Sequence, residues 1–300
     1  GFAKGVVFII HGYAEHCGRY EHVATALTQQ GLDVFALDHM GHGQSDSAWG
    51  RRGLLWNYEW LVEDVLLLVH TVRSRYVSRC PGVVPPEASG DGDSGAAKLQ
   101  PRANVPPFHL LAHSMGGLIG IHVLAKEPEA FSSAVLIGSL IRGPAELEML
   151  RKPMHPLLGP FAAVLHTIAP SLGVKCLDLS TLCHTPCALE QYIEDPLVEL
   201  GPVPLRTTYE FLRASDAAID VAKDVRCPVL FLHGEADRIT QPAGSHLLYG
   251  ACGSRDKNLH IVPDGYHDLL NEPGWAETCR EVCEWFVQKQ QMNESWQSAT

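Results

Sequence analysis

The sequence predicts an α/β fold in which a mostly parallel β-sheet carries helices on both faces. Two observations predict it. Short apolar runs bounded by turn residues alternate along the chain with longer amphipathic stretches, as in parallel strands joined by helices. A proline-rich segment interrupts this alternation between two expected strands, which is typical of an inserted cap. The 300 residues, 46% of them hydrophobic, are enough to bury one large core.

Six buried strands are expected, because each of these runs is short and apolar and has turn residues at its ends. They lie at residues 5–10, 32–37, 108–112, 133–137, 228–232 and 259–262. Helices are expected where apolar residues recur at three- and four-residue spacing. These stretches are residues 19–29, 56–76, 116–126, 244–251 and 275–288.

Two stretches break the alternation. Residues 81–107 are dense in Pro, Gly, Ser, Asp and Ala, and this composition predicts a disordered surface insertion. Residues 141–205 contain nine prolines that divide the chain into short apolar pieces. Because open α/β sheets bind ligands outside the carboxyl ends of their strands, we expect this segment to form a cap there. The predicted division is a core of residues 1–140 and 206–300 and a cap of residues 141–205.

The net charge of −11 argues against a nucleic-acid partner, because a surface without clusters of Lys and Arg repels phosphates. No apolar run reaches the roughly 18 residues that a membrane-spanning helix requires. The nine cysteines show no Cys-x-x-Cys spacing and predict free thiols in a reducing compartment, hence a cytoplasmic protein. His184 between Cys183 and Cys187 invites a zinc interpretation, but no second ligand pair follows, so no metal or cofactor is expected.

The strongest chemical signal is the sequence HSMGG at residues 113–117, between an expected strand and an expected helix. A serine at such a junction is a nucleophile elbow, whose hydroxyl projects from a strained turn that only small neighbours permit. The helix amino terminus behind it favours developing negative charge. Ser114 is therefore predicted as a catalytic nucleophile, although Ala112 stands where the pattern usually has its first glycine. The alternative is a serine that only caps a helix.

A serine hydroxyl needs a base within hydrogen-bond reach and a carboxylate that orients the base. Two downstream strands are followed by the sequences HGEAD, ending at Asp237, and PDGYH, ending at His267. Because successive strands in such a sheet end side by side, we expect this pair to meet at the elbow, in the chain order typical of such sites. Glu235 stays open as an alternative carboxylate. His260 lies within a strand and His246 on a helix, so neither is expected to reach the elbow.

The tetrahedral intermediate of acyl transfer needs two backbone N–H groups aimed at its oxygen. Met115, directly after the serine, supplies one of them. We expect the N–H of Tyr13 to supply the other, because Gly12 lets the loop after the first strand turn toward the site; an ordinary glycine turn is the alternative. The glycines at 41–43 lack the spacing of a nucleotide-binding loop and are interpreted as a packing turn.

With these residues in place, the sequence resembles the monoglyceride lipases and lysophospholipase-like serine hydrolases of the α/β-hydrolase superfamily. The resemblance rests on HGYAEH and RY within 11–20, DHMGHGQS at 38–45, AHSMGG at 112–117, YIEDPL at 192–197, Ala236-Asp237 and Tyr266-His267. It implies an α/β-hydrolase fold and an esterase that cleaves monoacylglycerols or lysophospholipids through an acyl-enzyme. It also implies that Tyr192, Glu15, Arg19 and His113 line the polar end of the substrate pocket.

The resemblance further implies two strands before Gly1, whose absence would leave unpaired backbone groups at the sheet edge. The apolar pieces of the cap are expected to cover a fatty acyl chain and to touch membranes transiently at their surface. Three alternatives stay open. An acyltransferase would pass the same acyl group to an alcohol, and a non-catalytic ligand-binding protein can retain the fold. Peptidase activity also stays open.

Overall fold

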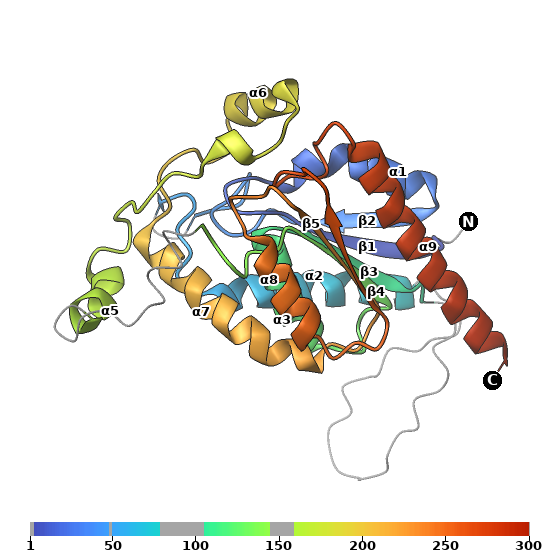
Figure 1. Ribbon diagram of the computed structural model, residues 1–300. Coiled ribbons are helices and arrows are strands. Elements are labelled where there is room, and N and C mark those ends of the chain that lie inside the picture. The colour runs from blue at the N-terminus through green and yellow to red at the C-terminus, as the bar shows by residue number, and fades with distance from the viewer. Residues whose placement is uncertain (1–2, 48–49, 79–104, 145–158, 300) are drawn as a thin grey trace, which may run out of the picture.

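The computed structural model describes residues 3–47, 50–78, 105–144 and 159–299 (Figure 1). Across this part of the chain it has one six-stranded sheet in the order β2-β1-β3-β4-β5-β6, with every neighbouring pair parallel. The strands are β1 (Gly5–Ile10), β2 (Leu32–Ala36), β3 (Phe108–His113), β4 (Ser133–Ile137), β5 (Val229–Gly234) and β6 (Lys257–Val262). The expected parallel sheet is confirmed, and each strand begins and ends close to its expected bounds.

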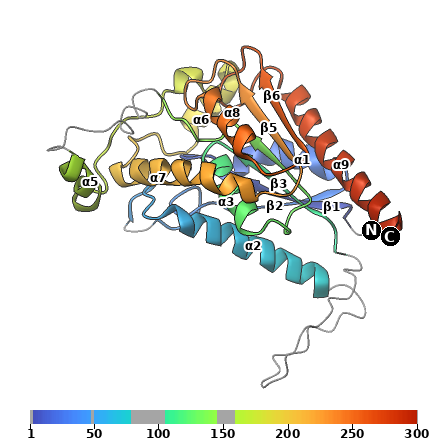
Figure 2. The same ribbon diagram turned by 60° about the horizontal axis from the view of Figure 1, so that its bottom comes forward.

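Helices cover both faces of the sheet (Figures 1 and 2). The α-helices are α1 (Glu21–Gln29), α2 (Tyr58–Ser78), α3 (Met115–Lys126), α5 (Gly159–Ile168), α6 (Pro186–Glu194), α7 (Leu205–Val221), α8 (Pro242–Ala251) and α9 (Trp275–Ala299). Short 3₁₀ turns lie at Cys17–Tyr20, Leu179–Thr181 and Ala222–Asp224. The five expected helices are all present, and α9 continues well beyond its expected end.

The core lies on both faces of the sheet, because successive side chains of a strand point to opposite faces. On β1, Val6 and Phe8 belong to a cluster with residues of α2, α3 and α7, whereas Val7 and Ile9 belong to a cluster with residues of α1 and α9. All six residues of β1 are buried. Burial on both sides explains why this strand is a continuous apolar run instead of an alternating one.

The sequence analysis predicts no helix at residues 205–221, and this is wrong. The structure has a helix of 17 residues there, α7, which packs against α2, α3 and α8. Its buried side chains include Phe211, Ala214 and Ala218, at three- and four-residue spacing. Small alanines make this stripe weakly apolar. Prolines at 202 and 204 precede the helix, where they do not interrupt its hydrogen bonds.

The strand order reverses beside β1, because the chain goes from β1 to β2 on one side and later to β3 on the other. Loops that leave the strand ends on the two sides of such a point diverge, and the crevice between them is where open α/β sheets bind ligands. Residues 12–16 follow β1 and Ser114 follows β3. The fold therefore brings both predicted parts of the site to the same crevice.

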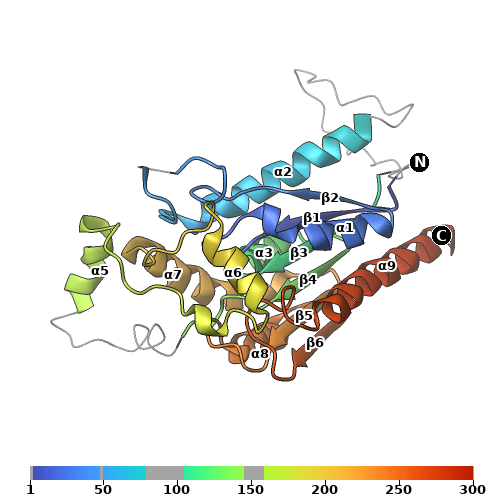
Figure 3. The same ribbon diagram turned by 90° about the horizontal axis from the view of Figure 1, so that it is seen from above.

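Most of the insertion expected at 81–107, and residues 145–158 of the expected cap, lie outside the described part of the chain. The described part of residues 141–205 includes α5, the turn at Leu179–Thr181 and α6. In all three views α5 stands at the periphery, away from the sheet, whereas α6 lies over the strands when the molecule is seen from above (Figure 3). No helix among the described residues is long and apolar enough to cross a bilayer.

Candidate active site

Ser114 stands on the turn between β3 and α3. Its φ and ψ are 56° and −118°, a conformation that residues other than glycine seldom adopt. The start of α3 packs closely against the end of the neighbouring strand β1: a Cβ on Gly116 would lie 2.1 Å from the carbonyl oxygen of Ile10, the last residue of β1. The methyl group of Ala112 is buried in β3 without preventing the turn. The packing of α3 against β1 and β3 therefore holds the serine in a strained conformation, as at other functional sites.

Ser114, His267 and Asp237 form a continuous hydrogen-bonded chain. Nε2 of His267 lies 2.9 Å from the Oγ of Ser114, and its Nδ1 lies 2.7 Å from Oδ2 of Asp237. Asp237 follows β5 and His267 follows β6, and these two strands are neighbours in the sheet. All three side chains are buried. The structure thus brings together the three residues that the sequence singles out.

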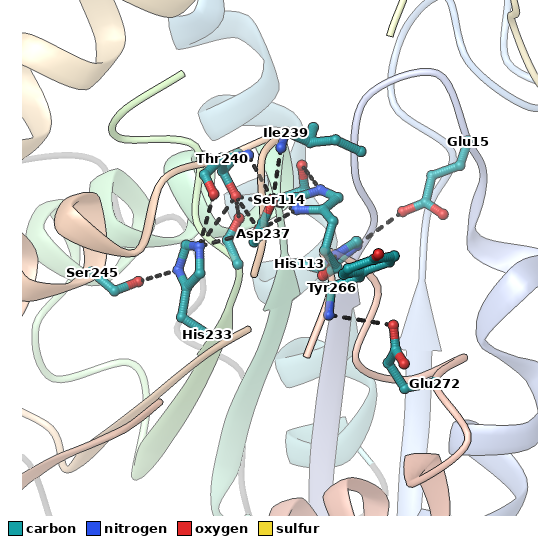
Figure 4. Close-up of polar contacts among 12 residues, drawn as sticks. Glu15, His113, Ser114, His233, Asp237, Ile239, Thr240, Ser245, Tyr266 and Glu272 are labelled. Atoms are coloured by element: carbon teal, nitrogen blue, oxygen red, sulfur yellow. Dashed lines mark hydrogen bonds and ion pairs between the residues drawn. The ribbon is translucent and has the colours of Figure 1, made fainter. Parts of the chain in front are cut away.

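Asp237 is held by more groups than the sequence suggests (Figure 4). Its Oδ1 accepts the N–H groups of Ile239 and Thr240 at 2.8 and 2.9 Å, and the Thr240 hydroxyl donates to its Oδ2 at 2.7 Å. Nε2 of His233 lies 3.1 Å from the same oxygen. Burial by itself would raise the pKa of Asp237, but His267 and His233 outweigh burial and hold this pKa well below its usual range. The carboxylate is therefore ionised at neutral pH.

The sequence analysis missed Thr240 and His233. The hydroxyl of Thr240 also lies 3.1 Å from Nδ1 of His267, so it contacts both the carboxylate and the imidazole. A signal for it existed, because aspartate side chains in turns often bind groups two or three residues further on. His233 offered no such signal, since it belongs to the buried strand β5 and its ring is fixed by Ser245, 2.7 Å away.

The alternatives weighed from the sequence lie elsewhere. Glu235 is exposed, and its Oε2 accepts the N–H of Asp264 at 3.3 Å. His260 is exposed on β6 and lies 2.9 Å from Glu281 of α9. His246 is exposed on α8. None of the three belongs to the hydrogen-bonded chain of the buried site.

The loop after β1 is shaped by Glu15. Its Oε1 accepts the N–H of Gly12 at 2.7 Å, and a Cβ on Gly12 would lie 2.7 Å from the same oxygen. Ala14 has a φ of 70°, in the left-handed region. Within the described residues, the N–H groups of Tyr13 and Met115 have no protein acceptor. Both N–H groups are thus available to an oxygen atom of a ligand.

A buried pair of charges lies beside this loop. Oε1 of Glu15 accepts the hydroxyl of Tyr20 at 2.6 Å and lies 3.3 Å from Nδ1 of His113. Burial lowers the pKa of His113, but the hydrogen bond and the charge of Glu15 outweigh burial and raise this pKa to about 9. Burial would raise the pKa of Glu15, but His113 and Arg19 hold it well below its usual range. The pair is therefore an imidazolium beside a carboxylate at neutral pH.

Three of the four residues expected at the polar end of the pocket line the cavity, namely Glu15, His113 and Tyr192. The expectation for Arg19 needs correction, because it is not among the lining residues. Its guanidinium lies 4.6 Å from the ring centre of Tyr192 and 3.3 Å from Oε2 of Glu15. A second carboxylate, Asp268, lies 3.8 Å away. Arg19 therefore supports two lining residues from behind.

Ser114 opens onto a cavity of about 520 Å³, which Asp237 and His267 also line. This volume is within the usual range for small-molecule sites. The apolar part of the lining comes from the core and from residues 141–205 alike. It includes Leu140, Pro144, Val174, Leu177, Leu182, Val203, Phe211 and Ile239. A predominantly apolar cavity that ends on a hydroxyl beside an imidazole is suited to an ester of an apolar acid.

The described residues contain no group of three or more His, Cys, Asp or Glu that could hold a metal ion. His184, considered above as a zinc ligand, instead binds Glu272, with its Nδ1 2.9 Å from the carboxylate. The eight cysteines in the described part of the chain are free thiols.

Comparison with known proteins gives matches over nearly the whole chain. A family model described as serine aminopeptidase, S33, matches residues 1–84 and 90–274. The monoacylglycerol lipase of Mycolicibacterium smegmatis is 33% identical over 284 residues, covering 95% of this chain and 88% of that protein. The monoglyceride lipase of Homo sapiens is 32% identical over 272 residues, covering 91% of this chain and 78% of that protein.

Solved structures give the same likeness. The monoacylglycerol lipase of Paleococcus ferrophilus superposes with a TM-score of 0.75 at 25% identity, covering 96% of both chains. A soluble variant of the monoglyceride lipase from Saccharomyces cerevisiae, in complex with a substrate analogue, gives a TM-score of 0.71 at 20% identity, covering 96% of this chain and 87% of that one. The second likeness concerns the fold alone.

Proposed function

The chain belongs to the family described as serine aminopeptidase, S33, and we propose that it is a serine hydrolase that cleaves esters of glycerol with a single fatty acid. It is a carboxylic ester hydrolase of the acylglycerol type, like the lipases of Mycolicibacterium smegmatis and Homo sapiens to which it is similar. One observation carries the assignment of the serine: Ser114, His267 and Asp237 form an unbroken hydrogen-bonded chain at the wall of an apolar cavity.

The first half of the reaction forms an acyl-enzyme. The Oγ of Ser114 attacks the ester carbonyl carbon while Nε2 of His267 accepts the hydroxyl proton. The ionised Asp237 binds the Nδ1–H of the imidazole, which fixes its tautomer and stabilises the imidazolium. The N–H groups of Tyr13 and Met115 bind the oxyanion of the tetrahedral intermediate. The intermediate then expels the glycerol alkoxide, which takes the proton from Nε2.

The second half returns the enzyme. A water molecule gives a proton to Nε2 of His267 and attacks the acyl carbon, and the second tetrahedral intermediate uses the same two N–H groups. Its collapse releases the fatty acid and returns the proton to Ser114. The glycerol part of the substrate is held at the polar end of the cavity by Glu15, His113 and Tyr192, which carry both hydrogen-bond donors and acceptors.

We assign residues 141–205 to a cap that completes the acyl-chain pocket. Val174, Leu177, Leu182 and Val203 supply part of its apolar lining. Since each buried CH₂ contributes roughly 0.8 kcal/mol, contacts of this kind set the preference for acyl length. The same segment exposes large apolar side chains at Val164, Ile168, Leu172, Ile193 and Leu200. These fit transient contact with the membranes in which such substrates reside, and the free thiols fit a cytoplasmic location.

The decisive experiment labels the purified protein with a fluorophosphonate, which reacts only with an activated serine. We expect stoichiometric labelling of the native chain and none of Ser114→Ala, at unchanged circular dichroism. Hydrolysis is then measured on a panel of monoacylglycerols, lysophospholipids and p-nitrophenyl esters, with an aminoacyl p-nitroanilide as the peptidase arm. A chain that stays unlabelled, or one that cleaves the anilide and spares the monoacylglycerols, would refute the proposal.

A further inference from the structure

The loop that carries His267 is held from the cap as well as from the core. The backbone N–H of His267 donates to the carbonyl oxygen of Thr181 at 3.2 Å, and that of Asp268 donates to the carbonyl oxygen of Leu182 at 2.8 Å. Thr181 and Leu182 are buried and belong to residues 141–205. Two consecutive backbone groups at the base of the imidazole therefore have their acceptors in the cap.

A buried carboxylate, Glu272, reinforces this junction. Its Oε1 accepts the backbone N–H of Tyr266 at 3.3 Å, a contact drawn in Figure 4. The same oxygen accepts the backbone N–H of His184 at 3.1 Å, and Oε2 lies 2.9 Å from Nδ1 of the His184 ring. Glu272 thus joins the residue before His267 to a residue of the cap.

The side chains of the two joined residues also contact each other. The rings of His184 and Tyr266 stack, with their centres 3.5 Å apart and their planes inclined by 24°. Glu272 has 9% of its side chain exposed, whereas His184 has 40% exposed. The contact between Glu272 and His184 is therefore buried on the side of the catalytic loop and partly exposed on the side of the cap. Movement of the cap would break it first on the exposed side.

We propose that Glu272 is a positioning residue for His267, and that it makes the position of the imidazole depend on whether cap residues 181–184 are packed against the catalytic loop. The proposal rests on the proposed function, in which His267 is the general base. Glu272 takes no part in the chemistry. It fixes the loop so that Nε2 stays within 2.9 Å of the Oγ of Ser114. A displacement of about 1 Å at such a site can cost on the order of 100-fold in rate.

The consequence is that the cap does more than bind the acyl chain. A substrate too short to reach the cap lining still needs the cap to be packed against the catalytic loop, because Thr181, Leu182 and His184 hold that loop in place. A cap that only covers the acyl chain would be irrelevant to such a substrate. This difference separates a positioning role from a binding role.

The test measures the hydrolysis of p-nitrophenyl acetate, a short ester, by Glu272→Ala, Glu272→Gln and His184→Ala. Rates are expressed per active site titrated with a fluorophosphonate, so that misfolded protein does not count. We expect Glu272→Ala to lower kcat about 10- to 100-fold, as for a lost hydrogen bond to a charged group, with KM changed less than about twofold. Glu272→Gln keeps an acceptor oxygen for the two N–H groups and is expected to recover most of the rate.

A second histidine–glutamate pair provides the matched control. His260 and Glu281 lie 2.9 Å apart on the exposed surface of β6 and α9, and Glu281→Gln is expected to leave kcat unchanged. The positioning role is overturned if Glu272→Ala and His184→Ala keep the native kcat per titrated site, or if Glu281→Gln loses as much. Should Glu272→Ala fail to fold, His184→Ala decides alone. Native protein that is not labelled at Ser114 would refute the proposed function instead.

Discussion

Asp237 is fixed by four contacts that do not involve His267. They come from the N–H groups of Ile239 and Thr240, from the Thr240 hydroxyl and from the ring of His233. A carboxylate held on so many sides has little freedom to rotate, so the direction in which it binds the imidazole is set before substrate arrives. Preorganisation of this kind is the usual source of catalytic power in such sites.

Thr240→Val tests the contribution of one of these contacts. The substitution keeps the shape of the side chain and removes the hydroxyl that lies 2.7 Å from Oδ2 of Asp237. Since a hydrogen bond to a charged group contributes about 1.5–3 kcal/mol, we expect kcat to fall at least about tenfold with KM little changed. Thr240→Ser keeps the hydroxyl and should retain most of the activity. Steady-state kinetics on a monoacylglycerol measure both variants, and equal activity of Val and Ser would contradict the expectation.

Gly116→Ala tests how closely the start of α3 packs against the end of β1, beside the elbow. The new Cβ would lie 2.1 Å from the carbonyl oxygen of Ile10, which is backbone and cannot swing away. We expect a loss of about 3 kcal/mol or more in the free energy of unfolding, as for severe overpacking, measured by urea denaturation. Gly250→Ala is the control, because that position of α8 has open space around it and should change stability by no more than about 1 kcal/mol. Similar stabilities for the two variants would show that α3 and β1 are not tightly packed beside the elbow.

Elements differ in how much of their position the sequence can predict. Ser114, Asp237 and His267 each lie within five residues of the carboxyl end of a short strand, so parallel packing of the strands is enough to bring them to one edge. Thr181 and Glu272 have no such constraint, since their contacts depend on the course of two irregular segments. Glu272 could not be recognised from the sequence, because its partners are backbone N–H groups and a histidine 88 residues away.

A second attachment of the cap lies at the loop after β1, where Nε2 of His16 is 2.8 Å from Oδ2 of Asp195 and the N–H of Glu199 donates to the carbonyl oxygen of Ala14 at 2.8 Å. Asp195→Ala removes the contact with His16 and loosens the loop that presents the N–H of Tyr13. Because pairs near the surface contribute up to about 1 kcal/mol, we expect kcat/KM to fall about two- to fivefold for short and long esters alike. A loss confined to long esters would contradict this reasoning.

Glu190→Ala removes an exposed negative charge from α6 itself and serves as the control for Asp195→Ala. It should leave kcat/KM unchanged for both classes of ester. If it lowers kcat/KM as much as Asp195→Ala does, the effect comes from the charge of the cap and not from its attachment.

For the whole molecule, the sequence predicts the sheet and its coverage well because they follow from patterns repeated along the chain. Strands of 5 or 6 residues show as short apolar runs, and five of the described helices show apolar residues at three- and four-residue spacing. Helix α7 shows the limit of this approach: its buried stripe is partly alanine, and Thr207, Thr208 and Glu210 are buried polar residues of the same helix. The charge of Glu210 is compensated inside the protein by ion pairs with Arg206 and Arg213. No hydrophobic pattern reveals such pairs.

The dependence of global stability on pH follows from the buried pair of His113 and Glu15. The pKa of His113 is raised from 6.5 to about 9 by Glu15, which outweighs burial, so the folded protein holds this proton more tightly than the unfolded chain does. The stabilisation is therefore complete below pH 6.5 and is lost as the pH rises through about 9. Glu15→Gln removes the charge but keeps an oxygen that accepts the N–H of Gly12.

We accordingly expect the free energy of unfolding of the native protein to fall more steeply between pH 6.5 and about 9 than that of Glu15→Gln. Urea denaturation at half-unit intervals of pH measures both profiles. Buried thiols such as Cys183, whose pKa burial raises to about 11, also lower stability as the solution becomes alkaline, but they do so equally in both proteins and cancel in the difference. Parallel profiles would mean that His113 is neutral in the folded protein, and the charge pair beside the loop of Tyr13 would have to be replaced by a neutral hydrogen bond.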